Sequence, residues 1–256
     1  MHFVKSSLVS SALIFCHFAY GASHPVSFVL IGDSTTANGT TPNSGGWGNG
    51  LCGSMITNNI ASVTANTPCI NTAHDGATTG SFVADGFWNI SLAAISGEVK
   101  RGRRTLVTIQ FGHNDMKIAP PESMGANLTS MVEQIRAIGG EPVLVTSLTR
   151  RTFNADGTVQ DALAPWANET ILISQQQGSH LLDLHAASIK YVEAIGPDAA
   201  HRLNRLPDDN THLNSNGTTV FGRMVADLLK ESFPHELPII PNPPLSFNIS
   251  HGIASF

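Results

Sequence analysis

The sequence has little charge and no long basic segment. Only 13% of the 256 residues are charged, with 14 Lys and Arg against 19 Asp and Glu. Nucleic acid and anionic membranes are recognised through clustered positive charge, so both are poor candidates for partners. The chain also lacks His-x-x-x-His pairs and cysteine clusters, so it does not predict a metal site. No internal repeat and no second domain boundary is visible.

Long apolar segments are equally scarce. Residues 8–20 form an apolar stretch that is too short to span a bilayer, and Lys5 precedes it. Small residues suited to cleavage follow at 19–22. This pattern predicts a secretory signal peptide over about residues 1–21. We therefore expect a secreted, extracellular protein without a membrane partner, whose main domain covers residues 22–233.

Cysteines are few, and their number fits the expected compartment. Cys16 would leave with the signal peptide, so Cys52 and Cys69 remain as one pair. In an oxidising environment such a pair predicts a disulfide, and two buried free thiols are the alternative. Six Asn-x-Ser/Thr sites are typical of a secreted glycoprotein. Asn38 and Asn216 lie close in sequence to the candidate site described next, which leaves four candidates for glycosylation: Asn89, Asn127, Asn168 and Asn248.

The apolar run at residues 26–31 is the feature around which the chain is organised. It is rich in β-branched and aromatic residues, predicts a buried strand, and ends at Gly32. Ser34 follows two residues later. In open α/β sheets, ligands bind at the carboxyl ends of the strands. Ser34 is therefore a candidate nucleophile.

Further strands and helices alternate along the chain. Apolar runs predict strands around 69–73, 105–111, 142–146 and 181–184, and helical periodicity appears at 91–98, 128–138, 163–173 and 220–229. This alternation predicts an α/β fold with three α/β/α layers: a parallel, flavodoxin-like sheet of about five strands with helices on both faces. Residues 36–50 are expected to form a loop. Residues 234–256 are rich in proline, and we expect an extended or irregular peripheral tail.

A second candidate site residue lies just before the last predicted helix. His212 follows Asp209 by three residues, so one short loop holds both. Such a carboxylate can accept from one imidazole nitrogen and leave the other facing a serine. Asp208 is an alternative partner for the histidine. The sequence thus supplies Ser34, Asp209 and His212 as a candidate triad.

Acyl transfer also needs hydrogen-bond donors where negative charge develops. Three donors follow predicted strands: the backbone N–H groups of Ser34 and Gly76, and the side-chain amide of Asn114. Each alone has a simpler explanation, since glycine and asparagine are common in turns. Together they predict an oxyanion hole at the same edge of the sheet as the candidate nucleophile.

These blocks resemble the SGNH, or GDSL, hydrolase family. The resembling segments are residues 32–34, Gly76, residues 112–115 and residues 209–212, in the family's order and over nearly the whole mature chain. The resemblance implies Ser34 as nucleophile, His212 as base, Asp209 as its orienting partner, and Ser34, Gly76 and Asn114 as the oxyanion hole. It implies no metal and no organic cofactor.

Within that family the sequence is most similar to the rhamnogalacturonan acetylesterases. Residues 32–35, 46–48 and 111–115 and the Asp209–His212 spacing carry the similarity; where those enzymes have Arg-Ser after the block-two glycine, residues 77–79 here are Ala-Thr-Thr. The similarity implies release of acetyl groups from plant cell-wall polysaccharide. The alternatives are a lipase or other carboxylesterase, an acetylxylan esterase, and a non-catalytic wall-binding protein on the same fold. A monomer is the default expectation for the oligomeric state.

Several residues near these blocks are candidates for contact with substrate. Trp47 lies among glycines, where it lines a sugar site or caps the core edge, and Arg150 and Arg151 follow a predicted strand. Arginines grip carboxylates with two parallel hydrogen bonds, so a uronate polymer is one ligand they fit; solvated surface arginine is the alternative. The candidates for substrate contact are Trp47, His113, Arg150 and Arg151, and a structural role is the alternative for His113. Asp33 and Asp115 are expected to be local hydrogen-bond acceptors.

Overall fold

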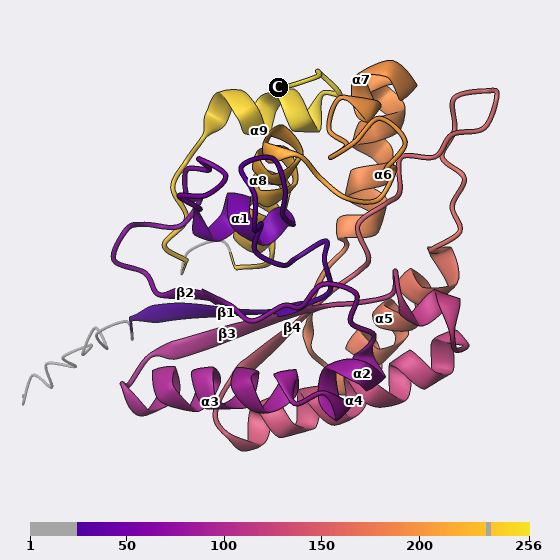
Figure 1. The fold of residues 1–256 in the computed structure, drawn as a ribbon. Coiled ribbons are helices and arrows are strands. Elements are labelled where there is room, and N and C mark those ends of the chain that lie inside the picture. The colour runs from indigo at the N-terminus through magenta and orange to yellow at the C-terminus, as the bar shows by residue number, and fades with distance from the viewer. Residues whose placement is uncertain (1–24, 234–236) are drawn as a thin grey trace, which may run out of the picture.

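The computed structural model describes residues 25–233 and 237–256, which form an α/β domain around one parallel sheet (Figure 1). The strand order is β2-β1-β3-β4-β5, and every neighbouring pair is parallel. The predicted flavodoxin-like order is therefore confirmed. The expected signal peptide lies outside the described residues. The strands are β1 (Val26–Gly32), β2 (Cys69–Asn71), β3 (Arg104–Gln110), β4 (Glu141–Val145) and β5 (His180–Leu182).

Helices cover both faces of the sheet, as predicted. Figure 1 shows α2, α3, α4 and α5 on one side and α1, α6, α7, α8 and α9 on the other. None of the described helices is long and apolar enough to cross a membrane. Their bounds are α1 (Trp47–Cys52), α2 (Thr79–Ala84), α3 (Phe87–Lys100), α4 (Pro121–Ala137), α5 (Ala164–Gln177), α6 (Leu184–Ile195), α7 (Pro197–His201), α8 (Ser215–Ser232) and α9 (Pro243–Ser250), with a 3₁₀ turn η1 (Asp115–Lys117).

Strand β1 explains how two cores form on one sheet. Side chains alternate between the faces of a strand, and both faces of β1 are buried. Phe28 and Leu30 pack with the core under α1, α6 and α8, whereas Val29 and Ile31 pack with the core under α3 and α4. A strand buried on both faces reads as a continuous apolar run, which is why this segment stood out in the sequence.

Helix α1 lies where the sequence predicted a loop. Residues 36–46 are irregular, but a short helix begins at Trp47. Its glycines permit close packing on α8: a Cβ at Gly50 would lie 2.0 Å from the Thr218 carbonyl oxygen, and one at Gly222 would meet the Gly50 backbone at 2.5 Å. The helix therefore depends on tertiary contact that local propensity does not reveal.

The C-terminal segment is more ordered than the proline content suggested. Ile239 bridges to Val63, and Ile240 donates its N–H to the Ser62 carbonyl at 2.7 Å. Helix α9 follows, packed against α8. Its two prolines occupy the first turn, where backbone N–H groups have no intrahelical partner, and the Asn242 side chain caps the helix. The expectation of an extended or irregular tail was therefore wrong for these residues.

Cys52 and Cys69 form a disulfide with a Cα–Cα distance of 5.4 Å. The bond joins the last residue of α1 to the first residue of β2. It closes a loop of residues 52–69 within the connection between β1 and β2, the strands that precede Ser34 and Gly76.

Candidate active site

Four segments of the chain meet in one pocket at the carboxyl ends of the strands. Ser34 follows β1, Gly76 follows β2, Asn114 follows β3, and His212 lies in the loop before α8. All four line a single cavity of about 220 Å³. The sequence placed each of them at the same sheet edge, and the structure brings them together there.

Ser34, His212 and Asp209 form a continuous hydrogen-bonded chain. Ser34 Oγ lies 3.0 Å from His212 Nε2, and His212 Nδ1 lies 3.0 and 2.9 Å from the two Asp209 carboxylate oxygens. With a proton on Nδ1, Nε2 has a free lone pair for the serine hydroxyl. The exposed Asp208 has no contact with the imidazole among the described residues, so Asp209 is the partner.

Asp209 is held as a carboxylate. Its partial burial would raise its pKa, but hydrogen bonds from the backbone and ring of His212, the charge of that ring and the N–H of Thr211 outweigh burial, so the pKa lies below the usual range. The carboxylate is therefore ionised at neutral pH, as needed to orient an imidazole and to stabilise its protonated form.

Arg151 packs against the loop that carries His212 (residues 202–214) and is not among the residues that line the pocket. Its side chain is fully buried; Nη2 donates to the His212 carbonyl at 2.9 Å, and Nε donates to Asn204 Oδ1. Its backbone N–H also bonds to the Asn210 carbonyl. Burial lowers its pKa to about 10, although the charge of Asp209 acts in the opposite sense. The expectation that Arg151 contacts substrate was therefore wrong: it fastens the loop that carries His212.

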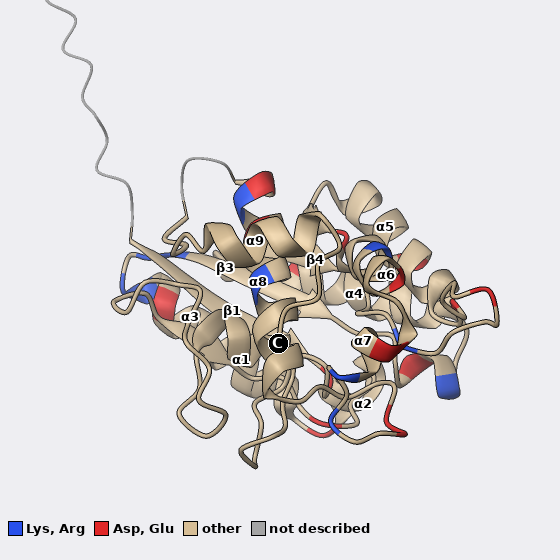
Figure 2. Ribbon diagram, turned by 90° about the horizontal axis from the view of Figure 1, so that it is seen from above, with Lys and Arg blue, Asp and Glu red and all other residues tan. Residues whose placement is uncertain are grey.

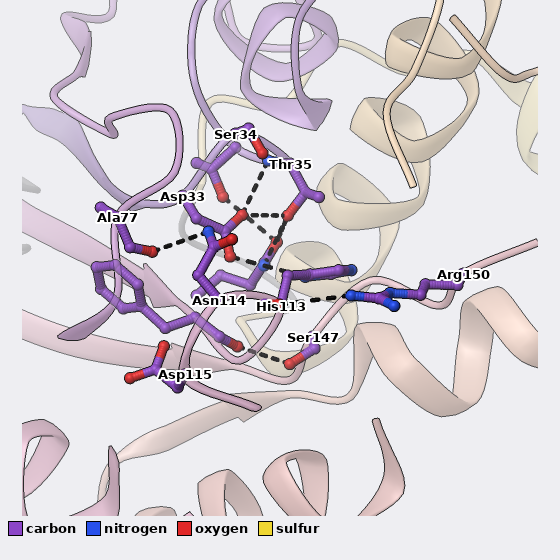
Figure 3. A network of polar contacts seen from close by, with 12 residues as sticks. Asp33, Ser34, Thr35, Ala77, His113, Asn114, Asp115, Ser147 and Arg150 are labelled. Carbon is purple, nitrogen blue, oxygen red and sulfur yellow. Dashed lines mark hydrogen bonds and ion pairs between the residues drawn. The ribbon is translucent and has the colours of Figure 1, made fainter. Parts of the chain in front are cut away.

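Gly76 and Asn114 line the same pocket as Ser34 and His212. Gly76 has φ +76°, a conformation that favours glycine, and a Cβ there would meet nothing within 4 Å. Its backbone therefore borders open space that a reactant can approach. The Asn114 amide donates from Nδ2 to the Ala77 carbonyl at 3.1 Å (Figure 3). Its Oδ1 accepts from Lys117 Nζ at 2.8 Å.

A buried polar network supports the turn that carries Ser34. Asp33 Oδ1 accepts from the Thr35 N–H at 2.9 Å and from Thr35 Oγ1 at 2.8 Å (Figure 3). Thr35 Oγ1 in turn accepts from Gln110 Nε2 at 2.8 Å, and Trp47 Nε1 donates to Gln110 Oε1 at 2.7 Å. Trp47 is fully buried. It caps the core edge, and the alternative expectation, that it lines a sugar site, was wrong.

His113 belongs to the same buried layer. Its ring is 2% exposed and its Nδ1 lies 3.7 Å from Asp33 Oδ2. Burial would raise the pKa of Asp33, but its contact with His113 and the donors of Thr35 outweigh burial and lower that pKa. His113 is thus shielded from the pocket, and its assignment to substrate contact was wrong. The contact between Asp33 and His113 links the turn that carries Ser34 to the turn that carries Asn114.

Asp115 is a local acceptor, as expected. Its Oδ1 accepts from the N–H and hydroxyl of Thr79 at 3.0 and 2.6 Å, which links η1 to the start of α2. Burial raises the pKa of Asp115; the Thr79 donors only partly offset this, and the nearby charge of Asp33 adds to it.

The cations that line the pocket are Arg205 and Lys117, although charged residues are sparse over the molecule (Figure 2). Arg205 Nε lies 3.6 Å from Asp209 Oδ2 and its side chain is 43% exposed. Arg150 is half-buried, and its Nη2 lies 3.4 Å from the His113 carbonyl, so it packs behind the site. Lys117 could not be predicted from the sequence, because only the fold brings its ammonium to Asn114. Residues of the polar segment 38–45 also line the pocket. The sequence predicted only a loop there, and not a part in the site.

The glycosylation candidates differ in their exposure. Asn89 and Asn168 are exposed on α3 and α5. Asn127 and Asn248 are partly buried and donate from Nδ2 to Thr79 and to Ser255, respectively.

Comparison with known proteins agrees with this geometry. Residues 30–220 match the model of the GDSL-like lipase/acylhydrolase family. Rhamnogalacturonan acetylesterase RhgT of Bacillus subtilis is 30% identical over 225 residues, which are 81% of this chain and 90% of that protein. The chain therefore belongs to the GDSL-like lipase/acylhydrolase family.

Two solved structures share the fold at low sequence identity. The protein YxiM of Bacillus subtilis is similar with a TM-score of 0.70 at 22% identity, covering 84% of this chain and 59% of that one. The acetylxylan esterase Axe2 of Geobacillus stearothermophilus is similar with a TM-score of 0.56 at 16% identity, covering 84% of this chain and 96% of that one. These likenesses support the α/β/α architecture.

Proposed function

We propose that this protein is a secreted serine esterase that removes O-acetyl groups from plant cell-wall polysaccharide, with pectic rhamnogalacturonan as its substrate. One observation carries the proposal: the hydrogen-bonded chain from Asp209 through His212 to Ser34 opens into a pocket that Gly76 and Asn114 also line. A nucleophile, an oriented base and candidate oxyanion donors in one cavity are the parts that acyl transfer requires.

In the proposed first step, His212 Nε2 removes the Ser34 proton as Oγ attacks the acetyl carbonyl. The resulting oxyanion accepts hydrogen bonds from the Ser34 and Gly76 N–H groups and from the Asn114 amide. The protonated imidazole, stabilised by Asp209, then gives its proton to the leaving sugar oxygen, and an acetyl-serine remains.

In the second step, water attacks the acetyl-serine with His212 as the base. The same donors stabilise the second oxyanion, and Oγ leaves with the proton held by His212. Acetate is released and the enzyme returns to its starting state. Apart from the attacking water, each step uses side-chain and backbone groups of this chain.

The size and lining of the pocket support a small acyl group on a polar substrate. A cavity of about 220 Å³ accommodates an acetyl group, and polar residues such as Asn38, Thr40 and Ser44 line it beside the serine. Arg205 supplies exposed positive charge that matches the carboxylate of a uronate. The similarity to RhgT, whose name states rhamnogalacturonan acetylesterase, supports the choice of polymer.

The test is acetate release from acetylated rhamnogalacturonan, acetylated xylan and a long-chain ester, with wild type beside Ser34→Ala. We expect release mainly from the pectic polymer, abolished by the substitution. Release mainly from xylan or the long-chain ester would keep the serine mechanism and reject the substrate. A folded wild type that releases nothing would support a non-catalytic binding protein.

A further inference from the structure

The Asn114 amide can serve an oxyanion in only one of its two orientations. Its nitrogen end donates hydrogen bonds and its oxygen end only accepts them. Rotation about the terminal torsion is broad and roughly two-fold, so the torsion itself does not choose between the ends. Something in the surroundings must therefore decide which end faces the carbonyl carbon attacked by Ser34.

Two contacts fix the amide, one at each end. Lys117 Nζ lies 2.8 Å from Oδ1, and Nδ2 donates to the Ala77 carbonyl at 3.1 Å. An ammonium has donors only and a carbonyl oxygen accepts only. A flipped amide would set its N–H groups against the ammonium and its oxygen against the Ala77 oxygen, and both contacts would be repulsive. No described residue accepts the second N–H of Nδ2, which leaves it available to a reactant in the pocket.

The local backbone brings Lys117 to this position. The 3₁₀ turn η1 begins directly after Asn114, and the Lys117 N–H donates to the Asn114 carbonyl at 3.1 Å. The turn returns the lysine side chain toward the asparagine side chain, although Lys117 is exposed. The ammonium is an ionised donor, which strengthens its hydrogen bond to Oδ1 and polarises the amide so that its N–H groups become better donors.

We propose that Lys117 is a positioning residue for the proposed esterase reaction: it locks the Asn114 amide with an N–H toward the oxyanion and polarises that amide. This inference rests on the proposed function, because it gives Lys117 a role only if Asn114 stabilises an oxyanion. It assigns Lys117 no contact with the substrate carboxylate.

The test compares steady-state kinetics of Lys117→Met and Lys117→Arg on a neutral ester, 4-nitrophenyl acetate, and on acetylated rhamnogalacturonan. Removing a whole oxyanion donor costs about 10²–10³-fold in kcat. We expect Lys117→Met to lower kcat about 10-fold on both substrates with little change in KM. We expect Lys117→Arg to retain most of the wild-type kcat. Lys190→Met removes an exposed lysine of α6 away from the pocket and serves as the control.

A double-mutant cycle separates positioning from a general structural effect. If Lys117 acts through Asn114, Lys117→Met has no further effect on kcat in an Asn114→Ala background. Additive losses would overturn the inference, as would wild-type kcat for Lys117→Met on the neutral ester. A rise in KM confined to the uronate polymer would also overturn it and make Lys117 a substrate ligand. Wild type lacking activity, or Ser34→Ala retaining it, would instead reject the proposed function itself.

Discussion

Replacement of Arg151 by methionine tests whether a buried guanidinium controls the histidine loop. Methionine matches the aliphatic part of the arginine side chain and removes both the charge and the hydrogen-bond donors. Arg151→Met removes the hydrogen bonds to the His212 carbonyl and to Asn204 Oδ1. The His212 carbonyl keeps a second donor, the Arg205 N–H at 3.0 Å, so it is not left unpaired.

The effect of Arg151→Met on stability is a difference between two opposing contributions. Two hydrogen bonds from a charged donor contribute roughly 3–6 kcal/mol. Burial of the charge opposes them: lowering the pKa from 12.5 to about 10 corresponds to about 3 kcal/mol. The net loss in the free energy of unfolding therefore lies within about 0–3 kcal/mol and is centred on about 1 kcal/mol, which lowers Tm by roughly 2–4 °C in a domain of this size.

The effect on catalysis follows from the position of His212. Loss of one anchor lets the loop shift, and a misplacement of about 1 Å can cost about 10²-fold in rate. We expect Arg151→Met to lower kcat by about 10–100-fold with KM nearly unchanged, measured by acetate release below the lowered Tm. Arg136→Met, an exposed arginine of α4 that donates to the Gly178 carbonyl, serves as the control. A higher KM on the uronate polymer with kcat unchanged would refute this account.

Three further variants test other parts of the site and of the fold. Asp209→Asn should lower kcat by about 10⁴-fold without unfolding the protein, because an amide no longer fixes the His212 tautomer; steady-state kinetics beside circular dichroism would check this. Replacing Cys52 and Cys69 by serine should lower stability by about 3 kcal/mol, given a sequence separation of 17, and denaturant unfolding that matches wild type would contradict this. Burial raises the pKa of Asp115 in the folded protein. Its protonated form therefore stabilises the fold at a pH below about 3.9, the pKa in the unfolded chain, and this stabilisation is lost as the pH rises through the higher pKa of the folded state. Asp115→Asn should therefore reduce the fall of stability across that pH range, measured by denaturant unfolding at successive pH values.

The parts of the fold that sequence patterns predicted are those set by local periodicity. Strand β1 is buried on both faces and reads as an unbroken apolar run, and α8 repeats its apolar residues every three or four positions. Helix α1 could not be predicted, because its glycines matter only against α8. The C-terminal helix α9 was hidden by prolines that are tolerated in a first turn.

The candidate site also contains residues that the sequence predicted and residues that it could not predict. Ser34, Gly76, Asn114 and His212 follow strands or precede a helix, so position along the chain indicated the shared sheet edge. The supporting residues were harder to assign, because burial depends on tertiary packing. Arg151 is polar in sequence yet fully buried.

The lysine of the pocket was harder still to predict. Lys117 meets Asn114 only through the geometry of η1, which neither composition nor periodicity indicates.

Labelling with a fluorophosphonate tests whether Ser34 is an activated nucleophile, because this reagent reacts with an activated serine and forms a stable adduct. The site of modification is found by mass spectrometry of proteolytic peptides from wild type and from His212→Ala. We expect one modified serine, Ser34, with loss of acetate release in step with labelling and much slower reaction in His212→Ala. Full acetate release from a protein labelled at another serine, or equal labelling rates in the two proteins, would contradict this expectation.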